Sequence, residues 1–231
     1  MDAIILAAGR GTRLRPLTDT IPKPLIPVAG RGTLLRLLDA LPEAIDRVIL
    51  VVGYLEERIR GTIGTEYHGR PVVYVSQTPL DGTGGALRAA ESVLQGERFL
   101  VVNGDDLYSR ADLERLCEEP RGVLVRQQKS LNAMDGWDAE DDHRLRGLKV
   151  LPPGEEGLIN VGAYVLGREW FETSPVLVPG KTDEWGIPQA IPELLDRYPY
   201  RAVLTSFWYP CGTFQEIQRA EEALQKISRA A

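Results

Sequence analysis

The chain has 231 residues, of which 43% are hydrophobic and 26% charged, and its formal net charge is −6. A chain of this length and composition buries a sizeable core and lies outside the collagenous, coiled-coil and disordered classes. The acidic balance argues against a surface built for nucleic acid, because such domains usually carry a basic excess. No apolar stretch approaches the roughly 20 residues of a membrane span. The N-terminal apolar run also lacks the basic leader of a signal peptide.

Cysteine and histidine are scarce, with only Cys117, Cys211, His68 and His143 in the chain. Two cysteines exclude a disulfide framework, and four dispersed residues are too few for a zinc site of Cys and His ligands. We therefore expect a cytoplasmic protein with no membrane partner.

Short apolar runs alternate with helical patterns over the first 120 residues, which is typical of stacked βαβ units around a mainly parallel sheet. Strands are predicted at 3–8, 48–52, 72–75 and 99–102, and helices at 33–41, 56–63 and 85–94. Beyond residue 121 the pattern loosens, with a polar, Asp-rich segment around 135–142. There we predict strands at 123–128, 145–150, 158–166 and 201–207, and helices at 188–195 and 214–227. A single two-lobed domain over residues 1–231 fits this order, with the second lobe covering the site.

Positive charge is concentrated near the N-terminus, where residues 1–30 hold four bases and two acids. The first predicted strand runs into the segment AAGRGTRLRPL at 7–17, and PKP follows at 22–24. Small residues after a strand let backbone N–H groups approach phosphate oxygens, and Arg13 can add paired charge-assisted hydrogen bonds. The segment therefore predicts a polyphosphate site. A dinucleotide fingerprint would need Gly where Leu14 stands, which weakens a dinucleotide-dependent oxidoreductase, and a P-loop would need Gly-Lys-Ser/Thr at positions 16–18.

These residues, with several later segments, resemble the sugar-1-phosphate nucleotidylyltransferases, which couple a nucleoside triphosphate to a sugar 1-phosphate and release pyrophosphate. The resemblance covers essentially the whole chain and includes AAGRGTRLRPLT, PKPLIPVAG, QTPLDGTGGAL, VVNGDDLY, LINVGAYVL, DEWGIPQAI and WYPCGTFQEI. It implies an α/β Rossmann-like three-layer sandwich with a mostly parallel mixed sheet. Residues 1–120 are then the nucleotide-binding half, and 121–231 the sugar-phosphate half with a closing helix. The hexapeptide-repeat acyltransferase domain of some relatives is expected to be absent.

The resemblance also implies roles for individual residues. Arg13 is expected to stabilise the departing pyrophosphate, Lys23 to bridge the α-phosphate and the sugar phosphate, and Asp105 to bind Mg²⁺. The expected nucleotide-binding residues are Ala8, Gly9, Gly11, Thr12, Gln77, Gly82 and Thr83. The expected sugar-phosphate-binding residues are Gly104, Lys149, Asn160, Gly162 and Glu184. No general base is required, because the attacking phosphate oxygen is already anionic at neutral pH.

Gln77 and the glycines after it are the candidate base-reading residues. A Gln amide donates and accepts at once, which suits a pyrimidine edge, and glycines permit close backbone approach to a flat base. In thymidylyl and uridylyl members of the family a Gln at this distance before the Gly contacts the base, whereas guanylyl members tend to have Glu. We therefore favour UTP or dTTP, with adenine left open and with a strand-end cap as the alternative role of Gln77.

Asp105 ends a predicted strand, where a carboxylate can hold Mg²⁺ against triphosphate oxygens. Capping the next helix is the alternative role for an acid here, and Asp106 can serve that purpose. The family's second metal carboxylate, in a W-x-D-x-G-T pattern, is replaced by Pro210.

The family's Glu-Lys-Pro sugar-site motif falls on residues 148–150, where Lys149 remains and the Glu is replaced by Leu148. The losses at 148 and 210 keep two alternatives open. One is a cytidylyltransferase for a non-sugar phosphate such as phosphocholine, and the other is a nucleotide-sugar-binding regulatory paralogue without catalysis. The resemblance also favours a symmetric homo-oligomer.

Overall fold

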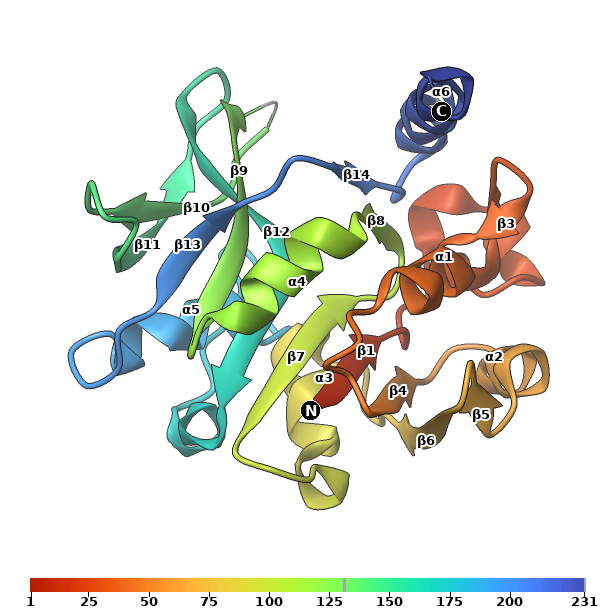
Figure 1. Ribbon diagram of the computed structural model, residues 1–231, viewed down its shortest axis with the longest axis horizontal. Helices are drawn as coiled ribbons and strands as arrows, with labels where there is room; N and C mark the ends of the chain where they lie inside the picture. The colour runs from red at the N-terminus through yellow and green to blue at the C-terminus, as the bar shows by residue number, and fades with distance from the viewer. Residues whose placement is uncertain (131, 231) are drawn as a thin grey trace.

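The computed structural model describes residues 1–130 and 132–230, and its centre is one mixed ten-stranded sheet between two layers of helices (Figure 1). The sheet follows the order β11-β10-β12-β7-β1-β4-β6-β5. In addition, β9 pairs with β12, and β13 pairs with β9. Its strands are β1 (Asp2–Leu6), β4 (Arg47–Val52), β5 (Glu66–Tyr67), β6 (Arg70–Ser76), β7 (Arg98–Asn103), β9 (Gly122–Lys129), β10 (Met134–Ala139), β11 (Leu145–Leu151), β12 (Glu156–Gly167) and β13 (Arg201–Leu204).

Parallel pairing dominates the part of the sheet formed by the first 120 residues, where β1 lies between β4 and β7 and β6 lies beside β4. The antiparallel pairing of β12 with β7 then joins the two halves of the chain into one sheet. This confirms the mostly parallel mixed sheet expected from the sequence.

Both faces of β1 are buried, which is why its sequence reads as a continuous apolar run. Ala3 and Ile5 pack on one face with α1 (Thr33–Ala40), α2 (Glu56–Ile63) and α4 (Arg110–Glu118). Ile4 packs on the other face with α3 (Gly82–Ala89) and α5 (Ile187–Ala190). The result is the three-layer α/β sandwich that the resemblance implied.

Two short strand pairs lie outside the main sheet, and neither was predicted. β8 (Asp106–Tyr108) pairs with β14 (Trp208–Pro210), and β2 (Pro27–Val28) pairs with β3 (Arg31–Gly32). The last helix, α6 (Phe214–Ala230), packs against β14 and β2 at the upper right of Figure 1. These short pairs bring the end of the chain next to the segment that follows β7.

No strand was predicted in the polar segment around 135–142, but much of this segment forms strand β10. Its alternating pattern places Trp137 in the core, while Asp138 points outward to pair with Lys149 on β11. Gly136 lies so close to β11 that a Cβ would come within 2.3 Å of a Leu151 methyl carbon. The residues Asp135, Gly136 and Asp138 are of types depleted in strands, and they obscured the strand pattern.

Several predicted elements have other boundaries. Helix α3 begins at Gly82 and ends at Ala89, and the predicted helix at 188–195 divides into α5 and a 3₁₀ turn, Ile191–Leu194. Strand β13 ends at Leu204. The Thr205 N–H still donates to Val125 of β9, but the N–H groups of Ser206 and Phe207 bond to the carboxylate of Asp112 on α4 instead of continuing the sheet.

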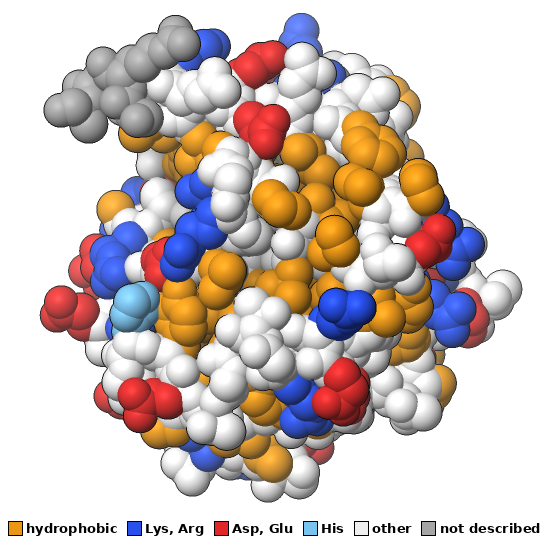
Figure 2. Space-filling model, turned by 90° about the vertical axis from the view of Figure 1, so that its right-hand side faces the viewer, with side chains coloured by type: hydrophobic (Ala, Val, Ile, Leu, Met, Phe, Trp, Pro, Cys, Tyr) orange, Lys and Arg blue, Asp and Glu red, His pale blue; other side chains and the backbone are white. Residues whose placement is uncertain are grey.

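The surface carries both signs of charge. On the face shown in Figure 2, hydrophobic, basic and acidic side chains are intermixed, and no block of one charge covers it. No helix among the described residues combines the length and apolar character needed to cross a bilayer.

Candidate active site

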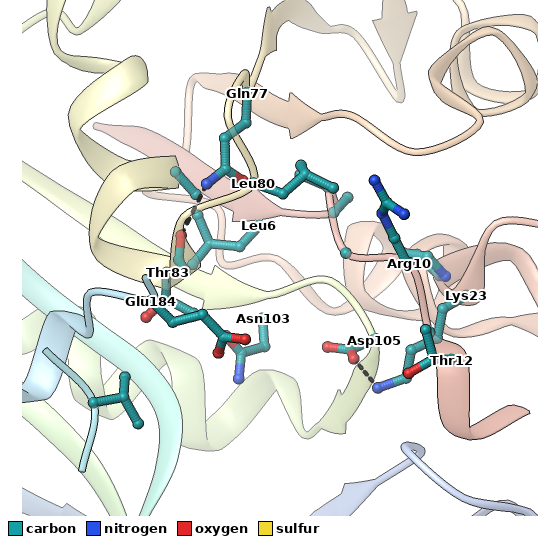
Figure 3. A pocket seen from close by; sticks show the side chains of 18 residues that line it. Leu6, Arg10, Thr12, Lys23, Gln77, Leu80, Thr83, Asn103, Asp105 and Glu184 are labelled. Carbon is teal, nitrogen blue, oxygen red and sulfur yellow. Dashed lines mark hydrogen bonds and ion pairs between the residues drawn. The ribbon is translucent and has the colours of Figure 1, made fainter. Parts of the chain in front are cut away.

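A cavity of about 510 Å³, here called the first cavity, opens at the carboxyl ends of β1, β6 and β7. Ligands bind in this position in open α/β sheets. Figure 3 shows Gln77 at one end of this cavity and Lys23 with Asp105 at the other. Of the residues expected to bind substrates or metal, ten line it: Ala8, Gly9, Gly11, Thr12, Lys23, Gln77, Gly82, Thr83, Asp105 and Glu184.

The loop after β1 forms one wall of the first cavity. Ala7 donates its N–H to the Val51 carbonyl at 2.8 Å, and the loop then turns at Gly11, whose φ is +62°. A Cβ on Gly11 would lie 2.9 Å from side-chain carbons of both Lys23 and Thr18, so this position requires glycine. The Thr18 hydroxyl donates to the Gly11 carbonyl at 3.0 Å and holds the turn in place. The loop is thus a rigid, glycine-dependent wall.

Lys23 donates a hydrogen bond to Asp105 and forms an ion pair with it inside the first cavity (Figure 3). Burial lowers the pKa of Lys23, but the charge and hydrogen bond of Asp105 and the charge of Asp106 together raise it above its ordinary value. Lys23 is therefore a cation at neutral pH. The first cavity therefore holds the positive charge of Lys23 next to the carboxylate of Asp105, which comes from the segment after β7.

Gln77 is buried, and its amide nitrogen donates to Asp81 Oδ1 at 2.8 Å and to the Gly82 carbonyl at 2.9 Å. Both of these partners can only accept hydrogen bonds, so the amide nitrogen must face them. The amide oxygen of Gln77 is then the group left to accept an N–H from a ligand. This arrangement is more specific than the sequence interpretation, in which the Gln77 amide both donates to the base and accepts from it.

Two glycines of the GTGG segment, Gly82 and Gly84, lie close to the backbone of Trp185. A Cβ on Gly82, whose φ is +95°, would lie 2.3 Å from the Trp185 carbonyl oxygen. That oxygen accepts the Gly84 N–H at 2.9 Å, and Trp185 donates its own N–H to the Asp81 carbonyl at 2.7 Å. The segment around Trp185, from the second half of the chain, is thereby attached to the start of α3 and brings Glu184 to the first cavity.

The expected sugar-phosphate residues are only partly brought together. Glu184 lines the first cavity, whereas Gly162 has a φ of +74° and makes room for Asn103, which also lines it. Asn160 accepts from Trp137 Nε1 at 3.3 Å and donates to the Tyr164 hydroxyl at 2.8 Å. Lys149 is 40% exposed and pairs with Asp138 at 2.8 Å, away from the cavity lining.

Gly104 lies against β1, where its N–H donates to the Leu6 carbonyl at 2.9 Å. A Cβ at this position would come within 3.0 Å of that same carbonyl oxygen. Gly104 therefore allows the chain to pass close to β1 just before Asp105. Gly104 is not among the residues that line the first cavity, and its expected contact with a sugar phosphate stays a prediction.

Arg13 follows Thr12 directly, but the two residues line different cavities. Thr12 lines the first, and Arg13 lines a second cavity of about 480 Å³ on the other side of the turn. One guanidinium nitrogen of Arg13 lies 3.0 Å from the position a Cβ on Gly212 would take. The expected contact of Arg13 with a departing pyrophosphate stays a prediction.

Several lining residues were not assigned from the sequence: Leu6, Ala7, Arg10, Pro24, Leu80, Ala86, Asn103 and Val178. Arg10 and Asn103 had a local signal, because one lies in the basic loop and the other ends a strand directly before Gly104. Val178 had none. It reaches the first cavity only because residues 178 and 184 share a backbone hydrogen bond of 2.9 Å.

The residues present fit a magnesium ion that is held largely by its substrate. Among the residues that the structure describes, no three His, Cys, Asp or Glu side chains form a metal-binding group. Pro210 lies opposite Asp106 in the β8–β14 pair and supplies no carboxylate. Asp106 is buried, and burial together with the Asp105 charge raises its pKa to about 7. Asp105 is thus the carboxylate available to Mg²⁺, which commonly uses one or two carboxylates plus substrate phosphates and water.

Comparisons with known proteins agree with this geometry. A solved UDP-glucose pyrophosphorylase complexed with UDP-glucose superposes with a TM-score of 0.83 at 22% identity, over 97% of this chain and 98% of the other. A putative glucose-1-phosphate thymidylyltransferase from Bacillus anthracis superposes with a TM-score of 0.81, also at 22% identity, over 96% and 94% of the two chains. At this identity the two superpositions establish the fold.

Curated relatives match over nearly the whole chain. The D-glycero-alpha-D-manno-heptose 1-phosphate guanylyltransferase of Aneurinibacillus thermoaerophilus is 29% identical over 97% of this chain and 99% of its own. The bifunctional protein GlmU of Methanocaldococcus jannaschii is 30% identical over 97% of this chain but 54% of its own length. The chain thus spans about half the length of the GlmU relatives. The family model for nucleotidyl transferases matches residues 2–122, more than half of the 231 residues, and the chain therefore belongs to the nucleotidyl transferase family.

Proposed function

We propose that the protein transfers a nucleoside monophosphate from a nucleoside triphosphate to a sugar 1-phosphate, forming a nucleotide sugar and releasing pyrophosphate. The observation that carries this proposal is the composition of the first cavity. It combines a glycine-dependent loop and Lys23 at one end, Gln77 at the other, and Glu184 from the second half of the chain. The heptose guanylyltransferase and a UTP–glucose-1-phosphate uridylyltransferase from Haloferax volcanii, 29% identical over 84% of the chain, support the same reaction class.

The chemistry consists of one in-line displacement. An anionic oxygen of the sugar phosphate attacks the α-phosphorus, a new P–O bond forms, and the bond between the α-phosphorus and the bridging oxygen breaks as pyrophosphate leaves. The charge that builds on the α-phosphoryl oxygens requires nearby cations and oriented N–H groups rather than a base. Lys23 and the loop at 9–12 supply these groups, and their rigid placement holds the two substrates in line.

Mg²⁺ is part of this proposal, with Asp105 as its protein ligand. The ion, when bound, neutralises charge on the triphosphate oxygens. When no ion is bound, Asp105 pairs with Lys23, and the Asp105 carboxylate holds the Lys23 ammonium within the cavity.

We favour UTP or dTTP as the donor. The oxygen of Gln77 is the group available to accept an N–H, and uracil and thymine each carry one ring N–H between two carbonyl groups. Guanine also carries a ring N–H, and the heptose relative is a guanylyltransferase, so GTP belongs in the test. The cytoplasmic location and the homo-oligomer expected above remain predictions.

Pyrophosphate release tests the proposal. The purified protein with Mg²⁺ is given UTP, dTTP, CTP, ATP or GTP together with sugar 1-phosphates or phosphocholine. Release that requires one sugar 1-phosphate and disappears in Asp105→Ala supports the transferase. Release that requires phosphocholine and CTP identifies the non-sugar cytidylyltransferase instead. Triphosphate binding without release under any combination supports a regulatory paralogue.

A further inference from the structure

Residues 176–187, here called the Glu184 segment, bring Glu184 from the second half of the chain to the first cavity. Much of the segment is exposed to solvent, and its first part is held by bonds within the segment itself. The N–H of Val178 donates to the Glu184 carbonyl at 2.9 Å, and the N–H of Gly186 donates to the Val176 carbonyl at 3.1 Å. The position of Glu184 therefore depends on the residues that fasten the segment to another element.

The end of the Glu184 segment is fastened to residues 81–84, at the start of α3. The backbone N–H and the carbonyl of Trp185 both bond to this stretch, at 2.7 and 2.9 Å respectively. The N–H of Ile187 donates to the Thr83 hydroxyl at 3.2 Å. Of these three contacts, the one to Thr83 is made by a side chain, so a substitution can remove it without changing the backbone.

The Thr83 hydroxyl also faces the first cavity, where Thr83 is exposed. A hydroxyl can donate one hydrogen bond, and among the described residues this one accepts from Ile187 and donates to no protein group. Its proton is therefore available to an acceptor on a bound nucleotide. Gln77, the candidate base-reading residue, bonds to the neighbouring Gly82 carbonyl at 2.9 Å, and in the view of Figure 3 Thr83 lies between Gln77 and Glu184.

We infer that Thr83 is a positioning residue that couples the two ends of the first cavity. A nucleotide that accepts the Thr83 proton polarises the hydroxyl, and hydrogen bonds in such a chain strengthen one another. The bond from Ile187 then becomes stronger and holds Glu184 in place for the second substrate. The coupling is reciprocal, so a sugar phosphate bound at Glu184 tightens nucleotide binding by the same factor. The assignment of the Glu184 end to the sugar phosphate rests on the proposed function.

Hydrogen exchange of the Glu184 segment tests the coupling without any transfer reaction. It is measured on the full chain alone and with saturating UTP, dTTP or GTP, in the absence of a sugar phosphate. Thr83→Val removes the hydroxyl and keeps the shape of the side chain, whereas Thr83→Ser keeps the hydroxyl. Thr62→Val makes the same change at an exposed position of α2, outside the cavity lining, and is the matched control.

We expect the nucleotide that binds to slow exchange in the Glu184 segment by about threefold or more, as the strengthening of a hydrogen bond would. The natural protein, Thr83→Ser and Thr62→Val should all show this slowing, and Thr83→Val should lose it. Equal slowing in Thr83→Val overturns the inference, because the nucleotide then acts on the segment without the hydroxyl. So does the absence of binding by all three nucleotides.

Steady-state pyrophosphate release gives a second readout. Thr83→Val is expected to raise the KM for the sugar 1-phosphate about fivefold or more with a smaller change in kcat, and Thr83→Ser should restore the KM. A fall in kcat with an unchanged KM overturns the inference, since it shows that Glu184 binds the second substrate equally well without the hydroxyl. If the natural protein releases no pyrophosphate, the proposed function fails, whereas the exchange measurement still decides the role of Thr83.

Discussion

The ammonium group of Lys23 and the carboxylate of Asp105, 82 residues apart in sequence, form an ion pair inside the first cavity. The side chains are only 13% and 26% exposed, so the pair is largely shielded from water. Each charge requires the other in the absence of substrate, because an unpaired buried charge is costly. A bound triphosphate and Mg²⁺ would offer both residues new partners of opposite charge.

Lys23→Ala is expected to lower turnover by roughly 100-fold or more, since it removes a cation aimed at charge that develops during the transfer. Steady-state pyrophosphate release measures the effect. Lys226→Ala, on the exposed part of α6, is the matched control and should retain full activity. Normal turnover in Lys23→Ala would remove Lys23 from the proposed chemistry.

The orientation of Gln77 is testable through a pair of substitutions. Gln77→Glu places a carboxylate opposite Asp81 and the Gly82 carbonyl, and we expect triphosphate binding to weaken by about tenfold or more. Adding Asp81→Asn supplies a donor to the new carboxylate and should restore most of the affinity, while Asp81→Asn alone should have little effect. Calorimetric titration of the four proteins with UTP measures the coupling. Equal affinity in all four would show that Asp81 does not orient Gln77.

Pro210→Asp supplies a carboxylate where the family pattern has one. We expect the Mg²⁺ concentration that gives half-maximal activity to fall by about tenfold, because two carboxylates bind Mg²⁺ more tightly than one. Pro210→Asn, which changes the backbone in the same way without adding charge, is the control. The same Mg²⁺ dependence in both variants would exclude position 210 from the metal site.

The carboxylate of Asp112 on α4 accepts hydrogen bonds from the chain after β13. We therefore expect the free energy of unfolding to depend on the ionisation of Asp112. Burial raises the pKa of Asp112, but hydrogen bonds from Thr205, the Phe207 backbone, Ser109 and Arg115 outweigh it and bring the pKa to about 2. The folded-state pKa lies below the ordinary 3.8, so the ionised form stabilises the fold above about pH 4 and this stability is lost as the pH falls toward 2.

Asp112→Asn should therefore lower the free energy of unfolding by about 2 kcal/mol at pH 7, and the difference from the natural protein should shrink between pH 4 and 2. Urea unfolding at a series of pH values measures it. Asp196→Asn, at an exposed position, is the control and should show little effect at any pH. A difference that stays constant down to pH 2 would contradict this assignment.

Much of the first cavity could be predicted from the sequence, because its residues follow strands whose apolar runs are easily recognised. The loop after β1, Gln77 after β6 and Asp105 after β7 meet since the carboxyl ends of parallel strands share one edge of a sheet. The two-faced burial of these strands also made the three-layer fold predictable.

Features that depend on contacts between distant segments had no local signal. The approach of the Trp185 backbone to Gly82, which brings Glu184 to the first cavity, is such a contact. The direction of Arg13 is another, because it depends on where β14 and α6 lie. Strand β10 was missed for a different reason, namely that it contains Asp135, Gly136 and Asp138, which are residue types more common in loops than in strands.

The most direct test of the proposed transfer follows the α-phosphorus itself. Radiolabelled UTP or dTTP, carrying ³²P at the α-position, is incubated with the protein, Mg²⁺ and a panel of sugar 1-phosphates, and the products are separated. The proposal predicts that the label moves into a nucleotide sugar only when one of the sugar phosphates is present. Label that remains in the triphosphate, or that appears in free nucleoside monophosphate regardless of the acceptor, would contradict it.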